Sequence, residues 1–313
     1  MTNKELYRSI CASQSSLPMF LQHWWMDAVC DDWDVAIARK GDHVTGVWPY
    51  ARTQRMGVSL MRNPRLTPYL GPHVFIPADV KESSRDSFEY EAIAELMSAM
   101  PNEKVWHLSL QPAFRQAGIF KEHGLQLQVQ QTFLIDLAKD EATLFSHLKE
   151  SLRRNIRTAE KEITITNEPQ YLPQLYEFQK HTLSAKDVQQ PYTLAQMQQI
   201  YDAAAAHNSA ALWVAKAGTE VQAIIWNVWD AERSYYFMGA KNPATDNYRA
   251  MAALLWHAIL QARQRGNTCF DLEGSMDPGV ERFFRGFGGT RQLYIILRKN
   301  TSLLWKLKEM VRG

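Results

Sequence analysis

The sequence predicts an α/β protein in which one mixed-sheet module is built twice. Residues 34–52 and 211–230 both have the pattern of strand, glycine-centred turn and strand, with Gly41 and Gly218 at the turns. The same order of further elements follows each hairpin. A chain of 313 residues is long enough for two domains that each bury their own core.

The elements after the two hairpins recur in one order: strand, helix, strand, phenylalanine/glycine segment and last strand. In the first half these elements are expected at residues 69–71, 88–100, 105–110, 119–124 and 133–137. In the second half they are expected at residues 234–239, 248–264, 268–272, 280–289 and 293–297. The repeat is too long for a solenoid, so we interpret the halves as tandem domains.

We expect the N-terminal domain at residues 1–140 and the C-terminal domain at residues 141–298. Asp140 can cap the first helix of the second domain. Residues 299–313 have the pattern of an amphipathic helix, which we expect to pack back on the body of the protein. Contact of this helix with a membrane surface is the alternative interpretation.

The helix after Asp140 is expected to present a basic face. Apolar residues recur at steps of four from Leu144 to Ile156, and basic residues recur from Lys149 to Lys161. These two rows lie about 100° apart on a helix. Residues 149–161 contain five basic and two acidic residues, a local charge of 5 − 2 = +3. The candidates for gripping a phosphate are Arg153, Arg154 and Arg157.

The composition is that of a soluble, cytoplasmic protein, with 46% hydrophobic and 22% charged residues. No run of 18 apolar residues predicts a transmembrane helix, and the first residues lack the apolar core of a signal peptide. The 3 cysteines and 9 histidines are scattered, so we expect neither disulfides nor a metal, and no permanently bound cofactor. Because the net charge is only +2, any anion site must come from a local cluster.

Several segments of the second half resemble the GNAT acyltransferase superfamily. They are residues 148–161 (LKESLRRNIRTAEK), 235–242 (YYFMGAKN), 247–266 (NYRAMAALLWHAILQARQRG), 269–275 (CFDLEGS) and 280–289 (VERFFRGFGG). Two such domains in tandem resemble the FemAB-like, or acetyltransferase 6, group. The resemblance implies an acyltransferase with acyl-CoA or aminoacyl-tRNA as donor. It also implies a small-molecule or peptidoglycan-precursor-like acceptor, with tRNA as a partner.

One departure from the GNAT pattern concerns the donor. Ordinary GNAT enzymes hold the coenzyme A pyrophosphate on a glycine-containing loop before the long helix. Here the corresponding residues 241–250 read KNPATDNYRA and contain no glycine. This departure favours a Fem-type acyl- or aminoacyltransferase that acts on an amine. A plain acyl-CoA N-acetyltransferase, and a duplicated scaffold that binds a ligand or partner without turnover, are the alternatives.

The candidate catalytic residues are two carboxylates in the second half. Asp271 and Glu273 alternate with Leu272, so both are expected on one face of a strand, where they could bind or deprotonate an amine. Two like charges this close raise the pKa of one of them. An ion pair with Arg249 or Arg285 that only orients a loop is the alternative.

The remaining candidates are residues expected to bind substrate or phosphate. In the second half they are Tyr236, Lys241, Asn242 and Arg249. In the first half they are Tyr50, Arg52 and Tyr69, which could line an acceptor cleft. The resemblance implies that the acyl carbonyl docks on backbone N–H groups where residues 234–239 and 269–272 diverge. No nucleophilic triad or activated cysteine is visible, so we expect direct transfer.

Overall fold

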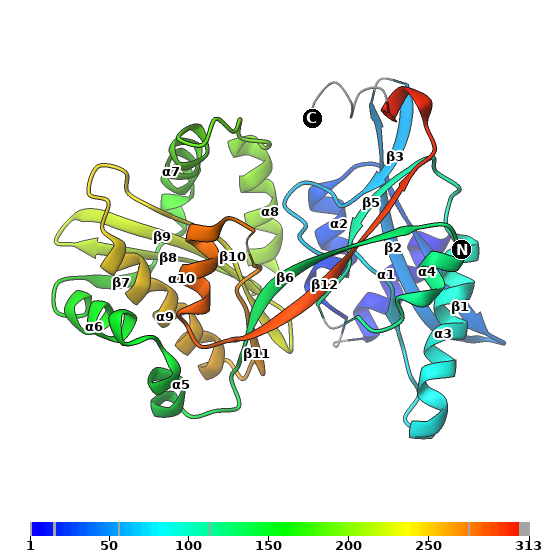
Figure 1. Cartoon of the computed structure of the whole chain (residues 1–313), viewed down its shortest axis with the longest axis horizontal. Helices are drawn as coiled ribbons and strands as arrows, with labels where there is room; N and C mark the ends of the chain where they lie inside the picture. Colours follow the sequence, from blue (N-terminus) through cyan, green and yellow to red (C-terminus); the bar gives the residue numbers. More distant parts are fainter. Residues whose placement is uncertain (1, 15–16, 56, 113, 275, 307–313) are drawn as a thin grey trace. The chain divides into compact units, whose positions relative to one another are not determined.

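The computed structural model describes residues 2–14, 17–55, 57–112, 114–274 and 276–306. The chain divides into two compact units. Unit 1 comprises Met1–Gln130 and Leu293–Gly313, and unit 2 comprises Gln131–Gln292. Each unit combines helices with a mixed sheet, which confirms the predicted α/β class (Figure 1).

Unit 1 contains a five-strand path with the order β1-β2-β3-β5-β12. Its elements are α1 (Asn3–Ser13), η1 (Met19–Leu21), α2 (His23–Val29), β1 (Trp33–Lys40), β2 (His43–Arg55), β3 (Val58–Arg62), β4 (His73–Val74), α3 (Glu82–Ala99), β5 (Val105–Ser109), α4 (Gly118–Glu122) and β12 (Thr290–Asn300). Along this path only β3 and β5 pair in parallel. The buried rings of Trp48, Trp106 and Phe120 pack edge to face in its core.

Unit 2 contains the strand order β6-β11-β10-β9-β8-β7. Its elements are β6 (Gln126–Asp136), α5 (Glu141–His147), α6 (Glu150–Ala159), β7 (Thr164–Asn167), η2 (Pro169–Tyr171), α7 (Leu172–Ser184), α8 (Leu194–Ala206), β8 (Ala210–Ala217), β9 (Glu220–Trp229), β10 (Arg233–Lys241), α9 (Tyr248–Gln264), β11 (Cys269–Asp271) and α10 (Pro278–Arg285). Here β10 and β11 form the parallel pair, and the hairpin and long helix lie where the sequence predicted them.

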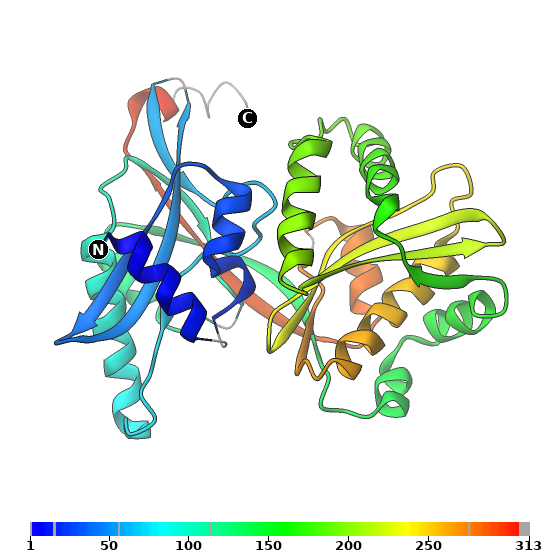
Figure 2. The same ribbon diagram turned by 180° about the vertical axis from the view of Figure 1, so that it is seen from behind.

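Helices cover both faces of the sheet in unit 2. Side chains of a strand point alternately to its two faces. In β9, Ile225 therefore joins the core formed with α9, while the neighbouring Trp226 stacks on Tyr201 of α8, with ring centroids 5.5 Å apart. Helix α9 lies in front of these strands in Figure 1 and behind them in Figure 2.

The unit boundaries differ from the predicted ones at residues 140 and 298. They fall between Gln130 and Gln131 and between Gln292 and Leu293, within strands β6 and β12. The end of β6 pairs with β11 of unit 2, and the end of β12 pairs with β5 of unit 1. Strand β6, the last strand of the first sequence repeat, thus completes the sheet of unit 2. Strand β12, the last strand of the second repeat, completes the sheet of unit 1. Periodicity locates a strand in the sequence but does not identify its partner.

The single helix predicted after Asp140 is two helices, α5 and α6, with extended backbone at Leu148 and Lys149. The N–H of Lys149 donates to the carbonyl of Gly286 at 2.8 Å, so a tertiary hydrogen bond holds the break. No proline or glycine marks this position in the sequence. The predicted Asp140 cap is confirmed, since its side chain accepts from the N–H of Thr143.

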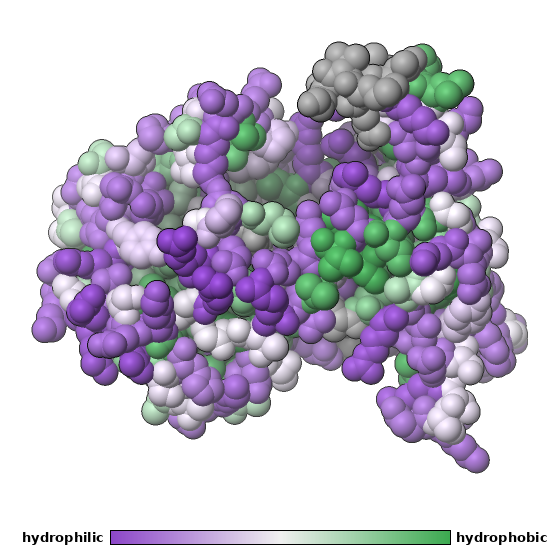
Figure 3. All heavy atoms as spheres, viewed as in Figure 1, coloured by the Kyte–Doolittle hydropathy of each residue, from purple (hydrophilic) through white to green (hydrophobic). Residues whose placement is uncertain are grey.

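The C-terminal segment packs on unit 1 through Trp305, which contacts the buried residues Val58, Leu60 and Val105. The predicted apolar face is wrong in its described part, because Leu303 and Leu304 are 76% and 66% exposed. The last described residues, drawn red in Figure 1, are partly green, that is apolar, at the same place in Figure 3. Residues 307–313 of the predicted helix lie outside the described residues. Among the described residues, no helix combines the length and apolar character needed to cross a membrane.

Candidate functional site

The sheet of unit 2 opens where β10 and β11 stop pairing. Their parallel ladder ends at the pair Tyr235 and Asp271, and β10 continues to Lys241. The register between β10 and β9 shifts between Tyr236 and Met238, which marks a bulge beside the opening. A bulge bends the strand and re-aims its backbone groups. The two strands therefore stop pairing within the segments where the sequence predicted a divergence, at the residue where β11 itself ends.

Asp271 lies at the base of this opening with its side chain fully buried. Its Oδ1 accepts hydrogen bonds from the Thr132 hydroxyl at 2.6 Å and from the N–H of Glu273 at 2.8 Å. Its Oδ2 is 3.5 Å from a guanidinium nitrogen of Arg233. The ion pair of Asp271 is therefore with Arg233, and not with the predicted partners Arg249 or Arg285. Asp271 is therefore held in a network that fixes the loop carrying Glu273.

Glu273 has surroundings different from those of Asp271. Strand β11 ends at Asp271, and Glu273 has a left-handed backbone with φ of 53°, so the predicted strand alternation does not reach it. Its Oε1 is shielded from solvent and has no hydrogen-bond partner among the described residues. Burial raises the pKa of Glu273 well above 4.5, and the charge of Asp271 adds to the rise. The predicted pair of coupled carboxylates is present, and Glu273 is the member whose pKa is raised.

Tyr236 forms one wall of the site beside Glu273. Burial, with a smaller effect of Glu273, raises the pKa of the Tyr236 phenol, which is neutral in the folded protein. The ring packs against Phe284 with centroids 5.3 Å apart and crosses Gly239, where an added Cβ atom would lie 2.7 Å from Cζ of the ring. Gln179 of α7 donates to the Gly239 carbonyl at 2.8 Å. These contacts fix the course of β10 past the opening.

The start of α9, where a coenzyme A pyrophosphate would dock in an ordinary GNAT domain, is occupied by the chain's own groups. Asn247 caps the helix by accepting from the N–H of Ala250 at 3.1 Å. Lys241 pairs with Asp246, and Asn242 donates to the Val221 carbonyl at 2.8 Å. Arg249 is exposed in the first turn of the helix. Of these candidates, Lys241 and Asn242 therefore have local structural partners.

The three predicted phosphate-binding arginines do gather. Arg153, Arg154 and Arg157 line a shallow hollow of about 610 Å³ together with Lys161. Arg153 donates to the Ser146 carbonyl at 3.0 Å, and the Arg157 guanidinium lies 5.2 Å from the centre of the Phe145 ring. Arg154 remains exposed. The hollow is a cationic surface on α5 and α6.

The candidates of the first half take part in the packing of unit 1. Tyr50 and Tyr69 are 7% and 4% exposed, and Tyr69 packs edge to face on Phe20. Arg52 forms an ion pair with Asp32 at 3.2 Å. Each of these three side chains is therefore held by neighbours among the described residues of unit 1.

Sequence reasoning missed Thr132, Arg233 and Gln179, which position the site. Thr132 of β6 and Arg233 of β10 are far in the chain from Asp271, which they contact. Gln179 of α7 is likewise far in the chain from Gly239. No motif joins them, because their proximity follows from strand register and helix packing. Burial raises the pKa of the Cys269 thiol to about 11, which disfavours its thiolate form. No group of three or more potential metal-ligating side chains occurs among the described residues.

Comparison with known proteins defines the class of the second unit first. Residues 146–285 match the family model of the Acetyltransferase (GNAT) domain, Acetyltransf_6. A search of curated proteins found no match to the sequence. Residues 146–285, less than half of the chain, are therefore similar to a GNAT acetyltransferase domain.

Solved structures then extend the likeness to both units. FemX is similar over 100% of this chain and 99% of its own, with a TM-score of 0.66 and 13% identity. The C-terminal domain (DUF2156) of a lysylphosphatidylglycerol synthetase candidate from Agrobacterium fabrum has a TM-score of 0.56 and 11% identity, covering 95% of this chain and 92% of that one. A tandem GNAT protein from the clavulanic acid biosynthesis pathway has a TM-score of 0.51 and 9% identity, covering 89% and 88%. The predicted resemblance to FemAB-like tandem GNAT proteins is confirmed.

Proposed function

We propose that unit 2 transfers an activated acyl group, in the Fem-type manner an aminoacyl group, to the nitrogen of an amine acceptor. The observation that carries this proposal is the position of the Glu273 carboxyl beside the point where β10 and β11 part. An acceptor amine and an acyl carbonyl brought together there would meet a base and a row of backbone N–H groups. These are the groups that acyl transfer requires.

The proposed reaction is direct. The acceptor ammonium loses a proton to the Glu273 carboxylate, and the nitrogen attacks the acyl carbon. Backbone N–H groups of β10 beyond Tyr235 would hold the oxyanion. The new C–N bond forms as the bond to the donor oxygen or sulfur breaks, and the proton on Glu273 passes to that leaving group. The freed Glu273 carboxylate then takes the second proton that the nitrogen loses as it becomes an amide, and releases it to solvent. A raised pKa suits Glu273 to this role, because a base is most effective when its pKa lies near the working pH.

Asp271 has a positioning role in this proposal. Its Oδ1 accepts from the Glu273 N–H, and Arg233 and Thr132 hold the Asp271 carboxylate in turn. The charge of Asp271 also raises the pKa of Glu273. Tyr236 would close one side of the site and limit the access of water.

The start of α9 favours aminoacyl-tRNA over coenzyme A as the donor. A helix N-terminus binds phosphate through unsatisfied N–H groups. Here Asn247 already accepts from one of them, and the acidic Asp246 lies next to the same turn. The cationic hollow of Arg153, Arg154 and Arg157 offers a separate surface for the phosphates of tRNA. FemX and the lysylphosphatidylglycerol synthetase candidate share the fold.

The test supplies both donors to the full chain in parallel. Bulk tRNA charged with ¹⁴C-labelled amino acids and ¹⁴C-acetyl-CoA are each incubated with a panel of primary amines, including lysine-containing peptides. We expect label to move from charged tRNA to an amine. Transfer from acetyl-CoA alone would favour the plain N-acetyltransferase. Binding of either donor without transfer or loss of its label would favour the non-catalytic scaffold.

A further inference from the structure

Unit 1 carries a cationic row at the position that corresponds to the opening in unit 2. In the parallel pair of unit 1, Arg62 of β3 lies opposite His107 of β5, and Arg298 of β12 lies opposite the same His107. Neighbouring strands are about 4.8 Å apart, so the backbones of the two arginines are about 10 Å apart. This arrangement joins residues that are distant in the sequence.

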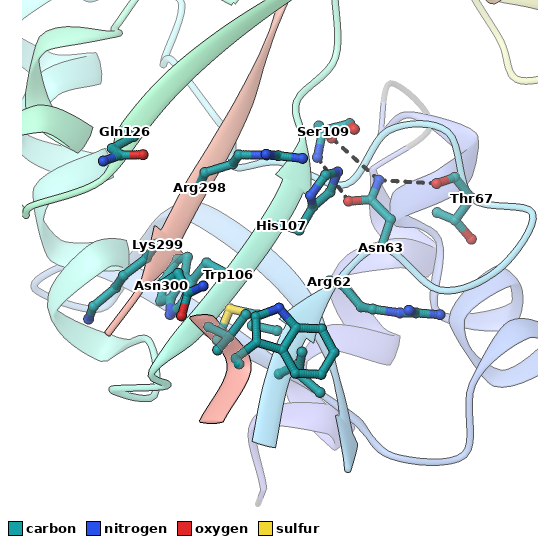
Figure 4. A pocket seen from close by; sticks show the side chains of 14 residues that line it. Arg62, Asn63, Thr67, Trp106, His107, Ser109, Gln126, Arg298, Lys299 and Asn300 are labelled. Carbon is teal, nitrogen blue, oxygen red and sulfur yellow. Dashed lines mark hydrogen bonds between the residues drawn. The ribbon is translucent and has the colours of Figure 1, made fainter. Parts of the chain in front are cut away.

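All three side chains point to the same face of the sheet. Met61, Trp106 and Leu297 immediately precede Arg62, His107 and Arg298, and they belong to the buried core of unit 1. Since successive side chains of a strand alternate, the cationic row lies on the opposite face. In Figure 4 the side chains of Arg298 and His107 lie close together, and Arg62 extends along another side of the pocket.

This row borders a cavity of about 460 Å³, a volume typical of small-molecule sites. Polar groups of Asn63, Thr67 and Ser109 lie at one end. The apolar wall contains Leu60 and Val105, against which Trp305 packs. The cavity therefore combines a cationic region with an aromatic and aliphatic one.

The positive charge in the cavity is not balanced by its lining. Among the described residues that line it, Arg62, Arg298 and Lys299 are cationic and none is Asp or Glu. The Nε of Arg62 is shielded from solvent and has no hydrogen-bond partner among the described residues. Burial and the nearby Arg65 and Arg55 lower the pKa of Arg62. A partly buried cation without a counter-charge in its surroundings is costly, and a bound anion would lower that cost.

Unit 2 has an opening where β10 and β11 stop pairing, and the corresponding position in unit 1 is closed. After Arg62, the side chain of Asn63 fills the space beside β5: its Oδ1 accepts from the Ser109 N–H at 2.9 Å, and its Nδ2 donates to the Thr67 carbonyl at 3.0 Å. Figure 4 shows these bonds as dashed lines. The corresponding last pair of the ladder in unit 2 is Tyr235 and Asp271. The same fold position therefore carries an acid in one unit and a cationic row in the other.

We propose that the cavity of unit 1 binds a small aromatic phosphate monoester. Its phosphate accepts hydrogen bonds from Arg298 and His107 in the field of Arg62, and its ring lies against Trp305 and Leu60. A phosphate suits this site because its oxygens can accept from several donors at once, and arginine matches that geometry. The proposal concerns unit 1 alone and does not depend on acyl transfer by unit 2.

Isothermal titration calorimetry of the full chain at about 0.15 M salt tests the proposal. The probes are phenyl phosphate, inorganic phosphate and benzoate. We expect saturable 1:1 binding of phenyl phosphate, weaker binding of inorganic phosphate, and the weakest binding of benzoate. Absence of saturable phenyl phosphate binding up to roughly 10 mM, a concentration beyond the weakest specific affinities, would overturn the proposal. Equal affinity for benzoate would overturn the assignment of phosphate.

Variants locate the binding on this cavity. Arg298→Gln changes an exposed side chain and is expected to fold, and Arg62→Gln changes a partly buried one. Both are expected to weaken phenyl phosphate binding at least tenfold. Trp305→Ala is expected to remove the preference for phenyl phosphate over inorganic phosphate. Arg39→Gln, an exposed arginine on β1 outside the cavity, is the control and should bind as the wild type does. Unchanged binding by Arg298→Gln would place the ligand elsewhere.

Discussion

The hydroxyl of Thr132 donates a 2.6 Å hydrogen bond to the fully buried carboxylate of Asp271, joining β6 to the end of β11. The same carboxylate holds the Glu273 N–H and faces Arg233. Removing the charge of Asp271 should therefore lower the stability of the fold, apart from any effect on catalysis.

Asp271→Asn is expected to lower the free energy of unfolding by about 2–3 kcal/mol, because Arg233 loses its counter-charge in a buried network. Urea unfolding measured by circular dichroism gives this value. The control is Asp202→Asn on the exposed side of α8, which should change stability by less than about 0.5 kcal/mol. Equal stability of Asp271→Asn and the control would show that the network contributes nothing to the fold.

Glu273→Gln is expected to change how stability depends on pH. The folded protein raises the pKa of Glu273 above 4.5, so the folded state holds this proton more tightly than the unfolded chain. The contribution of Glu273 to the free energy of unfolding is therefore greatest below about pH 4.5, and it falls as the pH rises toward the folded-state pKa of Glu273. Glutamine cannot ionise, so the Glu273→Gln variant does not lose this stability as the pH rises.

Melting temperatures between pH 4.5 and 8 test this sign. The stability of Glu273→Gln relative to the wild type should increase as the pH rises. At the upper end of the range the increase should be about 1 kcal/mol or more, which corresponds to a shift of roughly one pKa unit. Glu232→Gln, which alters an exposed carboxylate of the same unit, should show no such trend. A constant difference between Glu273→Gln and wild type would mean that Glu273 is ionised throughout.

Gly274→Ala tests the turn that carries Glu273. Gly274 has φ of 59°, and an added Cβ would collide with the Gln131 carbonyl and lie 2.8 Å from Cα of Thr132. Gly218 has a similar φ of 60° but open space around it. Gly218→Ala should cost only the backbone strain of about 1 kcal/mol.

We expect Gly274→Ala to cost at least about 2 kcal/mol more than this control, because backbone atoms must move. Chemical unfolding of both variants provides the comparison. If both lost the same stability, the packing of residue 274 against β6 would not constrain the loop.

Arg154→Gln tests the cationic hollow as a tRNA surface. If Arg154 contacts a phosphate, its loss should weaken binding of charged tRNA and reduce the slope of log affinity against log salt by about 1. Filter binding between 50 and 300 mM NaCl, roughly the range where such slopes are linear, measures both quantities. Arg282→Gln on exposed α10 has the same charge change and should leave the slope unaltered. A slope equal in both variants would remove the hollow from the donor site.

The hairpins and α9 could be predicted because they depend on local periodicity and turn residues. The strand expected at residues 69–71 is wrong, because the third strand of the first half is β3 at Val58–Arg62 and residues 69–71 have no regular structure. The predicted pair Asp271 and Glu273 is indeed adjacent, although the left-handed backbone at Glu273 replaces the expected strand alternation. The exchange of β6 and β12 could not be predicted, because a strand's pattern does not name its partner. For the same reason the row of Arg62, His107 and Arg298 was missed, since only strand register brings it together.

A single-turnover transfer assay with the donor that labels an amine tests the role of Glu273 most directly. Wild type and Glu273→Gln are compared at equal, saturating protein concentrations, with donor affinity measured separately by calorimetry. We predict that Glu273→Gln binds the donor with unchanged affinity and transfers its acyl group at least about 100-fold more slowly, the usual contribution of a general base. Transfer by Glu273→Gln at the wild-type rate would contradict the account.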